Sequence, residues 1–294
     1  MSRKTVIVLV VVAAVLLAVM LGLFLAFAIA SSASDVTDLK TWGKGLGYVE
    51  IEGTIVDATE TVRQLKALEH NSQVKGILIR VNSPGGVVTP SHEIYEEIRR
   101  IRDDGTPIIV SMGTLAASGG YYVSAPASRI VAGPQTLTGS IGVIMEFPVL
   151  KGVMDKIGVK VEVVKSRVHK DIGSPFREMT DQDRELLQGV VTDAYDQFVS
   201  IVSAEREIPE DSVRAFADGR IMTGRQALAL GLVDTLGTFE DAKRIAASLC
   251  DIEGEPRLIR ANRRINSWVR DLLKGTAEGL FGGFRFPRLR YMYY

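Results

Sequence analysis

The sequence predicts an α/β domain built on a parallel sheet with both faces covered, and three observations support this. From about residue 47, short apolar runs rich in β-branched residues alternate with amphipathic helical patterns. The central runs are almost continuously apolar, as in strands that are buried on both faces. With 294 residues, of which 46% are hydrophobic, the chain can also bury a full core.

The elements of this domain can be assigned in order along the chain. Apolar runs predict strands at 47–51, 75–82, 107–111, 128–132 and 159–165. Helical periodicity predicts helices at 58–70, 89–103, 118–125 and about 180–206. Beyond residue 209 the pattern indicates shorter helices and a last amphipathic helix at 263–276. The tail at 281–294 is rich in glycine, arginine and tyrosine and predicts no regular element.

The N-terminal segment has the pattern of a membrane anchor. Residues 5–30 carry no charge, and as a helix they would extend roughly 39 Å, enough to cross a ~30 Å hydrocarbon core. A cleavable signal peptide has a shorter apolar region, so we expect a retained single-pass anchor in the cell membrane, although AIASSA (28–33) leaves cleavage open. Arg3 and Lys4 precede the run, which places residues 1–4 in the cytoplasm and the remainder outside it.

The rest of the chain divides into a linker at 31–45, a main domain at 46–250 and a C-terminal helix and tail at 251–294. Cys250 is the only cysteine, so no intramolecular disulfide can form. Lys and Arg total 35, as do Asp and Glu, and this zero net charge gives no reason to expect nucleic-acid binding. No zinc-ligand spacing or phosphate loop is present, so we expect no metal or cofactor.

Two glycine-containing stretches are candidates for an acyl-transfer site. VNSPGGVVTP (81–90) follows a buried strand, and the Gly85 N–H could bind an oxyanion, although such a stretch taken alone is more often a plain strand-to-helix turn. In AASGGYY (116–122), Ser118 would begin a helix, where it could act as a nucleophile or merely cap the helix. The Gly119 N–H would be the second oxyanion donor, and neither Gly119 nor Gly120 carries a Cβ that would keep a substrate away.

The proton acceptor for such a serine would come from the polar segment 165–180. His169 and Asp171 share one side of an extended chain, so a local His–Asp pair is conceivable. A lysine is the alternative: its ordinary pKa is near 10.4, and burial can lower it to about 7–8, as a general base requires. On the residues alone, Lys165 and Lys170 are equal candidates.

A neutral lysine amine needs a hydrogen-bonding partner. TGSIGV (138–143) offers two hydroxyls for this purpose, those of Thr138 and Ser140.

Together these stretches resemble the signal peptide peptidase A family, membrane-anchored Ser–Lys proteases of the Clp protease/crotonase fold group. The resemblance covers about residues 46–250 and rests on five motifs in the family's order: VNSPGG (81–86), AASGGYY (116–122), TGSIGV (138–143), HKDIGSPFREMT (169–180) and DGRIMTGRQALALGLVDTLG (218–237). It implies the repeated ββα superhelix of that fold group, preceded here by one transmembrane helix.

The resemblance also implies a role for each matched residue. Ser118 would be the nucleophile and Lys170 the general base, in preference to Lys165. Ser140 would position the lysine amine. The amides of Gly85 and Gly119 would form the oxyanion hole.

The function implied is that of a serine endopeptidase for hydrophobic membrane-derived peptides, such as signal peptides already cut from their proteins. Short family members of this kind form homo-oligomeric rings at the membrane lipid in which the serine and lysine of one site come from neighbouring subunits. Three alternatives are a related protease that cuts particular membrane proteins, a crotonase-type acyl-CoA enzyme, and a non-catalytic membrane-anchored binding assembly.

Overall fold

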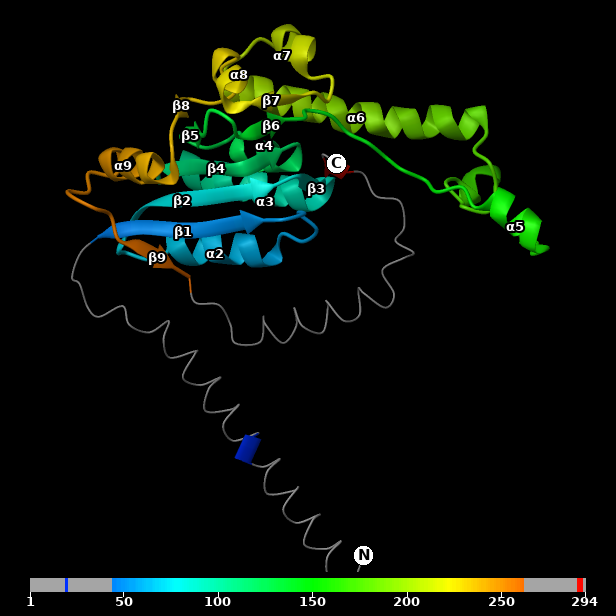
Figure 1. Ribbon diagram of the computed structural model, residues 1–294, viewed down its shortest axis with the longest axis horizontal. Coiled ribbons are helices and arrows are strands. Elements are labelled where there is room, and N and C mark those ends of the chain that lie inside the picture. Colours follow the sequence, from blue (N-terminus) through cyan, green and yellow to red (C-terminus); the bar gives the residue numbers. More distant parts are fainter. Residues whose placement is uncertain (1–18, 21–43, 262–289, 293–294) are drawn as a thin grey trace, which may run out of the picture. The chain divides into compact units, whose positions relative to one another are not determined.

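The computed structural model describes residues 19–20, 44–261 and 290–292 (Figure 1). The chain divides into residues 1–43 and 44–294, and the second unit holds all the strands described below. Apart from Val19 and Met20, the predicted anchor at 5–30 lies outside the described residues, as does the predicted helix at 263–276. Within the described ranges, no helix is both long enough and apolar enough to cross a bilayer.

An eight-stranded, largely parallel sheet forms the centre of the second unit. Its main path runs β7-β6-β4-β2-β1-β9, while β5 pairs with β4 and β8. Every pairing in this sheet is parallel except that of β6 with β7. The strands are β1 (Gly45–Glu52), β2 (Val74–Ser83), β4 (Ile108–Ala117), β5 (Arg129–Ala132), β6 (Leu137–Gly139), β7 (Ile221–Thr223), β8 (Thr235–Leu236) and β9 (Leu258–Arg260). Because β9 pairs with β1, the sheet extends past residue 250.

Helices cover both faces of this sheet. Ile77 and Ile79 of β2 pack in the larger core with α2 (Thr59–Glu69), α3 (Val88–Asp103), α4 (Gly119–Ser124) and part of α6 (Asp181–Arg206). Leu78, between them, faces the other way and packs with α9 (Phe239–Leu249). This alternation explains why the middle of β2, at 77–79, is apolar at consecutive positions. The remaining helices are α5 (Lys151–Ile157), the 3₁₀ helix η2 (Val168–Asp171), α7 (Glu210–Phe216) and α8 (Gly224–Ala229).

The predicted α/β class and most of the predicted elements are confirmed. The first four predicted strands correspond to β1, β2, β4 and β5, and the four predicted helices to α2, α3, α4 and α6. The strand predicted at 159–165 is wrong, because these residues pair with no strand in the described structure. Their alternating valines, Val159, Val161 and Val163, are 44–51% exposed. A segment with a two-residue apolar period forms a strand only where a neighbouring strand is present to share its backbone hydrogen bonds.

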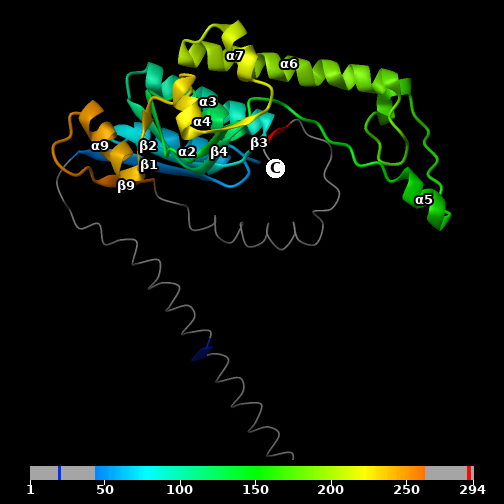
Figure 2. The same ribbon diagram turned by 45° about the horizontal axis from the view of Figure 1, so that its top comes forward.

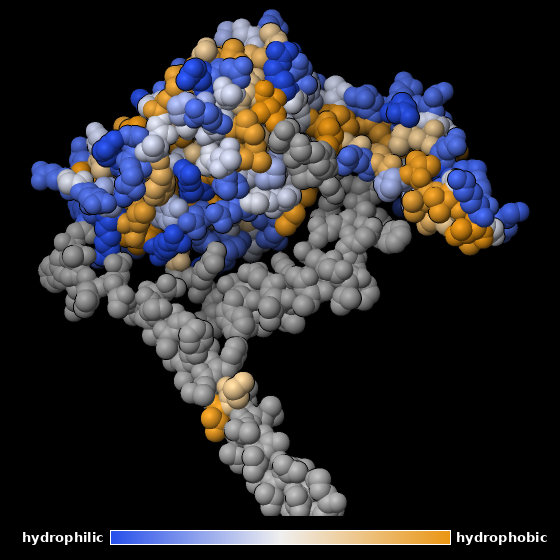
Figure 3. All heavy atoms as spheres, in the orientation of Figure 1, coloured by the Kyte–Doolittle hydropathy of each residue, from blue (hydrophilic) through white to orange (hydrophobic). Residues whose placement is uncertain are grey.

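The segment between β6 and α6 differs from the rest of the unit in its exposure. From residue 142 to residue 182 no residue is buried. Figure 2 shows that α5 lies beyond the far end of α6, away from the sheet strands. Apolar side chains gather over this segment in Figure 3, and they include Val149, Val153, Ile157, Val164 and Val168. We call residues 142–182 the arm.

A second, two-stranded sheet joins the C-terminal tail to the first glycine-containing stretch. β3 (Gly85–Val87) pairs antiparallel with β10 (Arg290–Met292), and the register places Tyr291 opposite Gly86. The prediction that the whole tail lacks regular structure is therefore wrong for these three residues. Their strand depends on a partner about 200 residues away, which local sequence patterns do not report.

Candidate active site

Three sequence motifs meet where neighbouring parallel strands end. β2, β4 and β6 lie side by side, with Ser83 paired to Ala116 and Ala117 paired to Gly139. The turn after β2, the serine after β4 and the turn after β6 therefore lie at one edge of the sheet. This carboxyl edge is where parallel α/β sheets commonly bind ligands.

Ser118 lies at the centre of this edge in an unusual backbone conformation. Its φ is 53° and its ψ is −116°, and its N–H donates to the Gly139 carbonyl at 2.8 Å. A positive φ costs a non-glycine residue on the order of 1–3 kcal/mol. The side chain does not cap α4. Its Oγ is buried and has no hydrogen-bond partner within the described part of the chain. A strained serine with a buried, unpartnered hydroxyl has the features of a nucleophile rather than of a cap.

The two tyrosines that follow hold α4, and with it Ser118, in the core. Tyr121 is fully buried and donates its hydroxyl to the Leu232 carbonyl at 3.0 Å. Tyr122 packs edge-on against Phe198 of α6, with ring centroids 4.9 Å apart. Its hydroxyl lies 2.9 Å from His92 Nδ1. Aromatic contacts and buried hydrogen bonds of this kind restrict movement of the short helix.

The glycines of the two motifs lie in direct contact. A Cβ on Gly119 would lie 3.0 Å from the Gly86 nitrogen and 3.1 Å from Gly85 Cα, so Gly119 leaves no room for a side chain. The Gly119 N–H belongs to the first turn of α4, where amides lack intrahelical partners. The Gly85 N–H already donates to Ser83 Oγ at 3.1 Å. The Gly86 amide, which the sequence analysis did not single out, is therefore a further candidate, and the paired glycines of SPGG were the available signal.

The turn after β6 brings Ser140 close to this group. Ser140 is buried, has a φ of 51° and follows Gly139, whose carbonyl accepts from Ser118. The alternative hydroxyl, that of Thr138, donates to the Ala116 carbonyl at 2.6 Å and is thereby engaged in the sheet. A cavity of about 600 Å³ opens beside Ser140 towards α6, and its lining includes Val143 and Tyr195.

Lys170 is the one predicted site residue that lies outside this group. It is exposed in η2 on the arm. Because Ser118 Oγ has no hydrogen-bond partner among the described residues, no hydrogen bond joins it to Lys170 within one chain. His169 does not form the suggested pair with Asp171: its Nδ1 lies 3.6 Å from Asp183 Oδ1.

The other candidate lysine is engaged in an ion pair. Lys165 Nζ donates to Asp171 Oδ1 at 2.7 Å, so this amine already has a carboxylate partner. Arg177 donates to the same carboxylate and also to Asp183 in the first turn of α6. From Asp183 to Phe198, where α6 contacts Tyr122, the helix rises about 22 Å. The arm is therefore anchored well away from α4.

The ion pairs of the arm predict a response to acid. Hydrogen bonds from Arg177 and Lys165 lower the pKa of Asp171 to about 2, and Arg177 holds the pKa of Asp183 well below its usual range. Because these folded-state values lie below the unfolded carboxyl value near 4, the stabilisation is complete above that pH and lost as the pH falls towards 2. We expect amides at 165–183 to lose hydrogen-exchange protection over this range, after correction for intrinsic rates, while those of β2 keep theirs. Unchanged protection of the arm at pH 2 would contradict this assignment.

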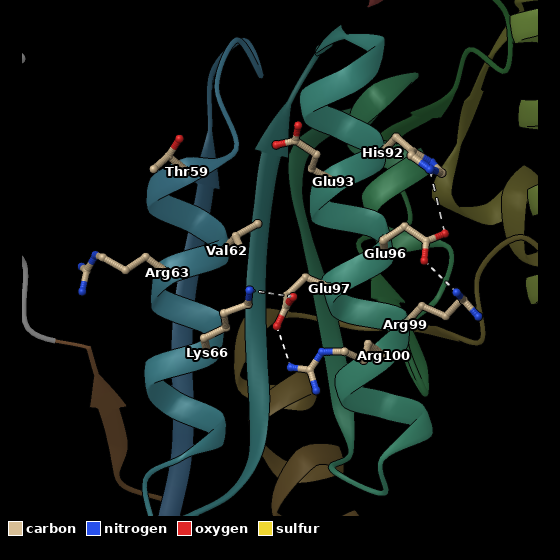
Figure 4. A pocket seen from close by; sticks show the side chains of 10 residues that line it. All are labelled: Thr59, Val62, Arg63, Lys66, His92, Glu93, Glu96, Glu97, Arg99 and Arg100. Atoms are coloured by element: carbon tan, nitrogen blue, oxygen red, sulfur yellow. Dashed lines mark hydrogen bonds and ion pairs between the residues drawn. The ribbon is translucent and has the colours of Figure 1, made fainter.

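A charged groove on the other side of α3 lacks the features of an active site. Its volume is about 790 Å³, and it lies between α2 and α3 (Figure 4). Two of its three carboxylates are paired: Glu96 accepts from Arg99, and Glu97 from Arg100, both at 2.7 Å. Its lining residues include no serine or cysteine. Among the described residues no group of side chains is arranged to hold a metal ion.

Comparison with known proteins agrees with this geometry. Residues 100–253, which include Ser118, Ser140 and Lys170, match the model of peptidase family S49. A Synechocystis protein provisionally named as a protease is 41% identical over 212 residues, covering 71% of this chain and 76% of the relative. The chain belongs to peptidase family S49.

Other S49 relatives have more specific names. An Enterococcus faecium protein provisionally named signal peptide peptidase SppA is 42% identical over 212 residues, covering 68% of this chain and 62% of that protein. The chloroplastic serine protease SPPA of Arabidopsis thaliana is 30% identical over 239 residues, covering 80% of this chain but 35% of its own length. This S49 chain is accordingly a protease.

Proposed function

We propose that this S49 protease is a membrane-anchored serine endopeptidase that cleaves hydrophobic, membrane-derived peptides, remnant signal peptides among them. Its nucleophile is Ser118 and its general base Lys170. The observation that carries the proposal is the buried, unpartnered Ser118 Oγ, together with the close approach of the following Gly119 to the Gly86 amide. The names of the SppA relatives and the uncharged run at 5–30 support the substrate class and the anchor. We also assign the domain to the ββα superhelix of the Clp protease/crotonase group.

The proposed reaction is acyl transfer in two steps. Neutral Lys170 takes the proton of Ser118 as the serine oxygen attacks the scissile carbonyl. The oxyanion is stabilised by Gly119 N–H and by the amide of Gly85 or Gly86, with Gly85 having to release Ser83. Protonated Lys170 then gives its proton to the leaving amine, and the same lysine activates water to release the acyl group. Ser140 hydrogen-bonds the lysine amine.

Because Lys170 is exposed on the arm and Ser118 is buried in the core, we assign the two halves of one site to neighbouring subunits of a homo-oligomer. The apolar side chains of the arm are suited to contact a second copy of the chain. The cavity beside Ser140 lies where the incoming lysine would have to enter.

The proposal is tested by assaying the full chain in detergent against a hydrophobic signal-sequence peptide and against an acyl-CoA ester. Hydrolysis of the peptide alone is expected. Turnover of the thioester alone would favour the crotonase-type alternative, and turnover of neither would favour a binding assembly.

β3 is the proposed substrate-binding strand, because its edge already accepts an extended chain. β10 pairs antiparallel with it and also contacts α4, the helix that begins after Ser118. A peptide substrate would form the same backbone hydrogen bonds. The chain's own tail is therefore a competitor for the substrate.

Deleting residues 290–294 is expected to lower the KM for a peptide substrate by about three- to tenfold, with kcat little changed, because binding no longer requires displacement of a competing strand. Steady-state kinetics of the full and shortened chains provide the measurement, with Tyr293→Ala as a control that keeps β10 intact. An unchanged or higher KM would argue against competition for β3.

A further inference from the structure

We infer that Arg177 is a positioning residue for Lys170: it fixes the turn that carries the lysine to α6 and keeps the Asp171 carboxylate away from the lysine amine. This inference rests on the proposed function, in which Lys170 acts as a neutral base. It concerns a residue that makes no contact with Ser118 and takes no part in bond making or breaking.

The contacts of Arg177 link two parts of the chain. Its Nε and Nη2 each donate to an oxygen of Asp171 at 3.0 Å, in a bidentate pair. Its Nη1 donates to Asp183 Oδ2 at 2.6 Å and to the Glu178 carbonyl at 2.9 Å. Bidentate arginine–carboxylate pairs fix geometry as well as charge. One guanidinium therefore connects η2, which contains Lys170, with the first turn of α6.

On the α6 side, Arg177 binds a carboxylate that is itself held in place. Asp183 is buried, whereas no residue at 142–182 is. Its carboxylate and backbone form a capping box with Thr180, which begins the helix. Because the rest of the arm has little packing, the orientation of Lys170 depends on this anchor more than on a hydrophobic core.

The charges around Asp171 have a second consequence. Asp171 directly follows Lys170, and a carboxylate within a few ångströms of an amine favours the charged ammonium, which cannot act as a base. Both oxygens of Asp171 are already engaged, by Arg177 and by Lys165.

The whole cluster is close to electrically balanced. Two cations, Lys165 before η2 and Arg177 after it, belong to the cluster. They pair with two anions, Asp171 of η2 and Asp183 of α6. His169 from η2 faces Asp183. The cluster therefore leaves no unpaired carboxylate next to Lys170, and removal of the guanidinium would leave Asp171 with Lys165 as its single cationic partner in the cluster.

The test compares kcat/KM as a function of pH for the full chain, for Arg177→Gln and for the double variant Arg177→Gln with Asp171→Asn. Arg177→Gln should move the midpoint of the acidic limb upward by about one pH unit, with activity about tenfold lower below it. The double variant should return the midpoint to its original position, since the carboxylate that lost its arginine is no longer present. Lys165→Gln, which removes one of the two cations, should shift it less, and Arg177→Lys should lie between Arg177→Gln and wild type.

A purely structural role would give a different result. If Arg177→Gln lowers activity equally at every pH, or if the double variant is shifted as far as the single one, the inference is wrong. Hydrogen exchange at 165–183 checks that each variant keeps the arm folded. Lys170→Ala is measured in parallel: activity retained in that variant overturns the dyad itself. An inactive Lys170→Ala with an unshifted Arg177→Gln overturns only the role of Arg177.

Discussion

Replacing Ser118 or Lys170 with alanine is expected to reduce kcat/KM for a peptide substrate by about 10⁴- to 10⁶-fold, as removal of a nucleophile or its base does in serine proteases. The unpartnered Oγ of Ser118 has no structural bond to lose, so its removal should leave the thermal midpoint almost unchanged. Lys170 is exposed, and its removal should likewise leave the fold intact. Lys160→Ala, a change at another exposed lysine of the arm, is the matched control and should keep full activity.

Mixing the two inactive variants gives the sharper result. If one site takes its serine and lysine from different subunits, dissociated and reassembled mixtures should recover about a quarter of wild-type activity, since random pairing joins both intact residues in that share of sites. Size-exclusion chromatography with the assay on each fraction locates the activity. Recovery of none, with mixed oligomers demonstrated, would mean that Ser118 and Lys170 act from one chain.

Gly119→Ala should reduce kcat/KM by about 10²- to 10³-fold, the usual loss when one oxyanion donor is displaced. The new Cβ would lie 2.9 Å from Ser91 Oγ and 3.0 Å from the Gly86 nitrogen, closer than such contacts allow. The β3 turn must move away, which changes the geometry of both candidate amides. The loss should appear mainly in kcat, because the interaction forms with the developing oxyanion.

Gly189→Ala provides the control for this substitution, because a Cβ there meets nothing within 4 Å and the residue lies inside α6. It should stabilise the chain by up to about 1 kcal/mol without altering kinetics. If Gly119→Ala retained more than a tenth of wild-type activity at an unchanged thermal midpoint, the Gly119 amide would not be an oxyanion donor.

The core of the fold was predictable from the sequence because its signals are local. The β-branched run at 75–82 and the helical period at 89–103 each report burial directly, and both elements formed as expected. The run at 159–165 has the same local pattern, yet it has no partner strand in the described structure. Residues 290–292 show the reverse case, in which a strand forms on a partner that the local sequence does not indicate.

The site divides in a similar way. Ser118 and the glycines around it stand out in the sequence because a serine followed by two residues without a Cβ, at the start of a helix, is a local pattern. The choice between Lys165 and Lys170 was not open to local reasoning. The preference for Lys170 came from the family resemblance, and the pairing of Lys165 with Asp171 in the structure is a contact that the local sequence does not report.

By itself, the sequence determined the α/β class, the order of the main strands and helices, and the stretches that carry the chemistry, because periodicity and residue type act over a few neighbouring positions. Only the tertiary structure decided which of these stretches meet. Parallel pairing brings Ser118, Gly119 and Ser140 to one edge, since strand register fixes where each turn falls. The tertiary structure also leaves Lys170 outside that edge. The long helix α6 extends away from the core, and Arg177 holds the arm to Asp183 in the first turn of this helix.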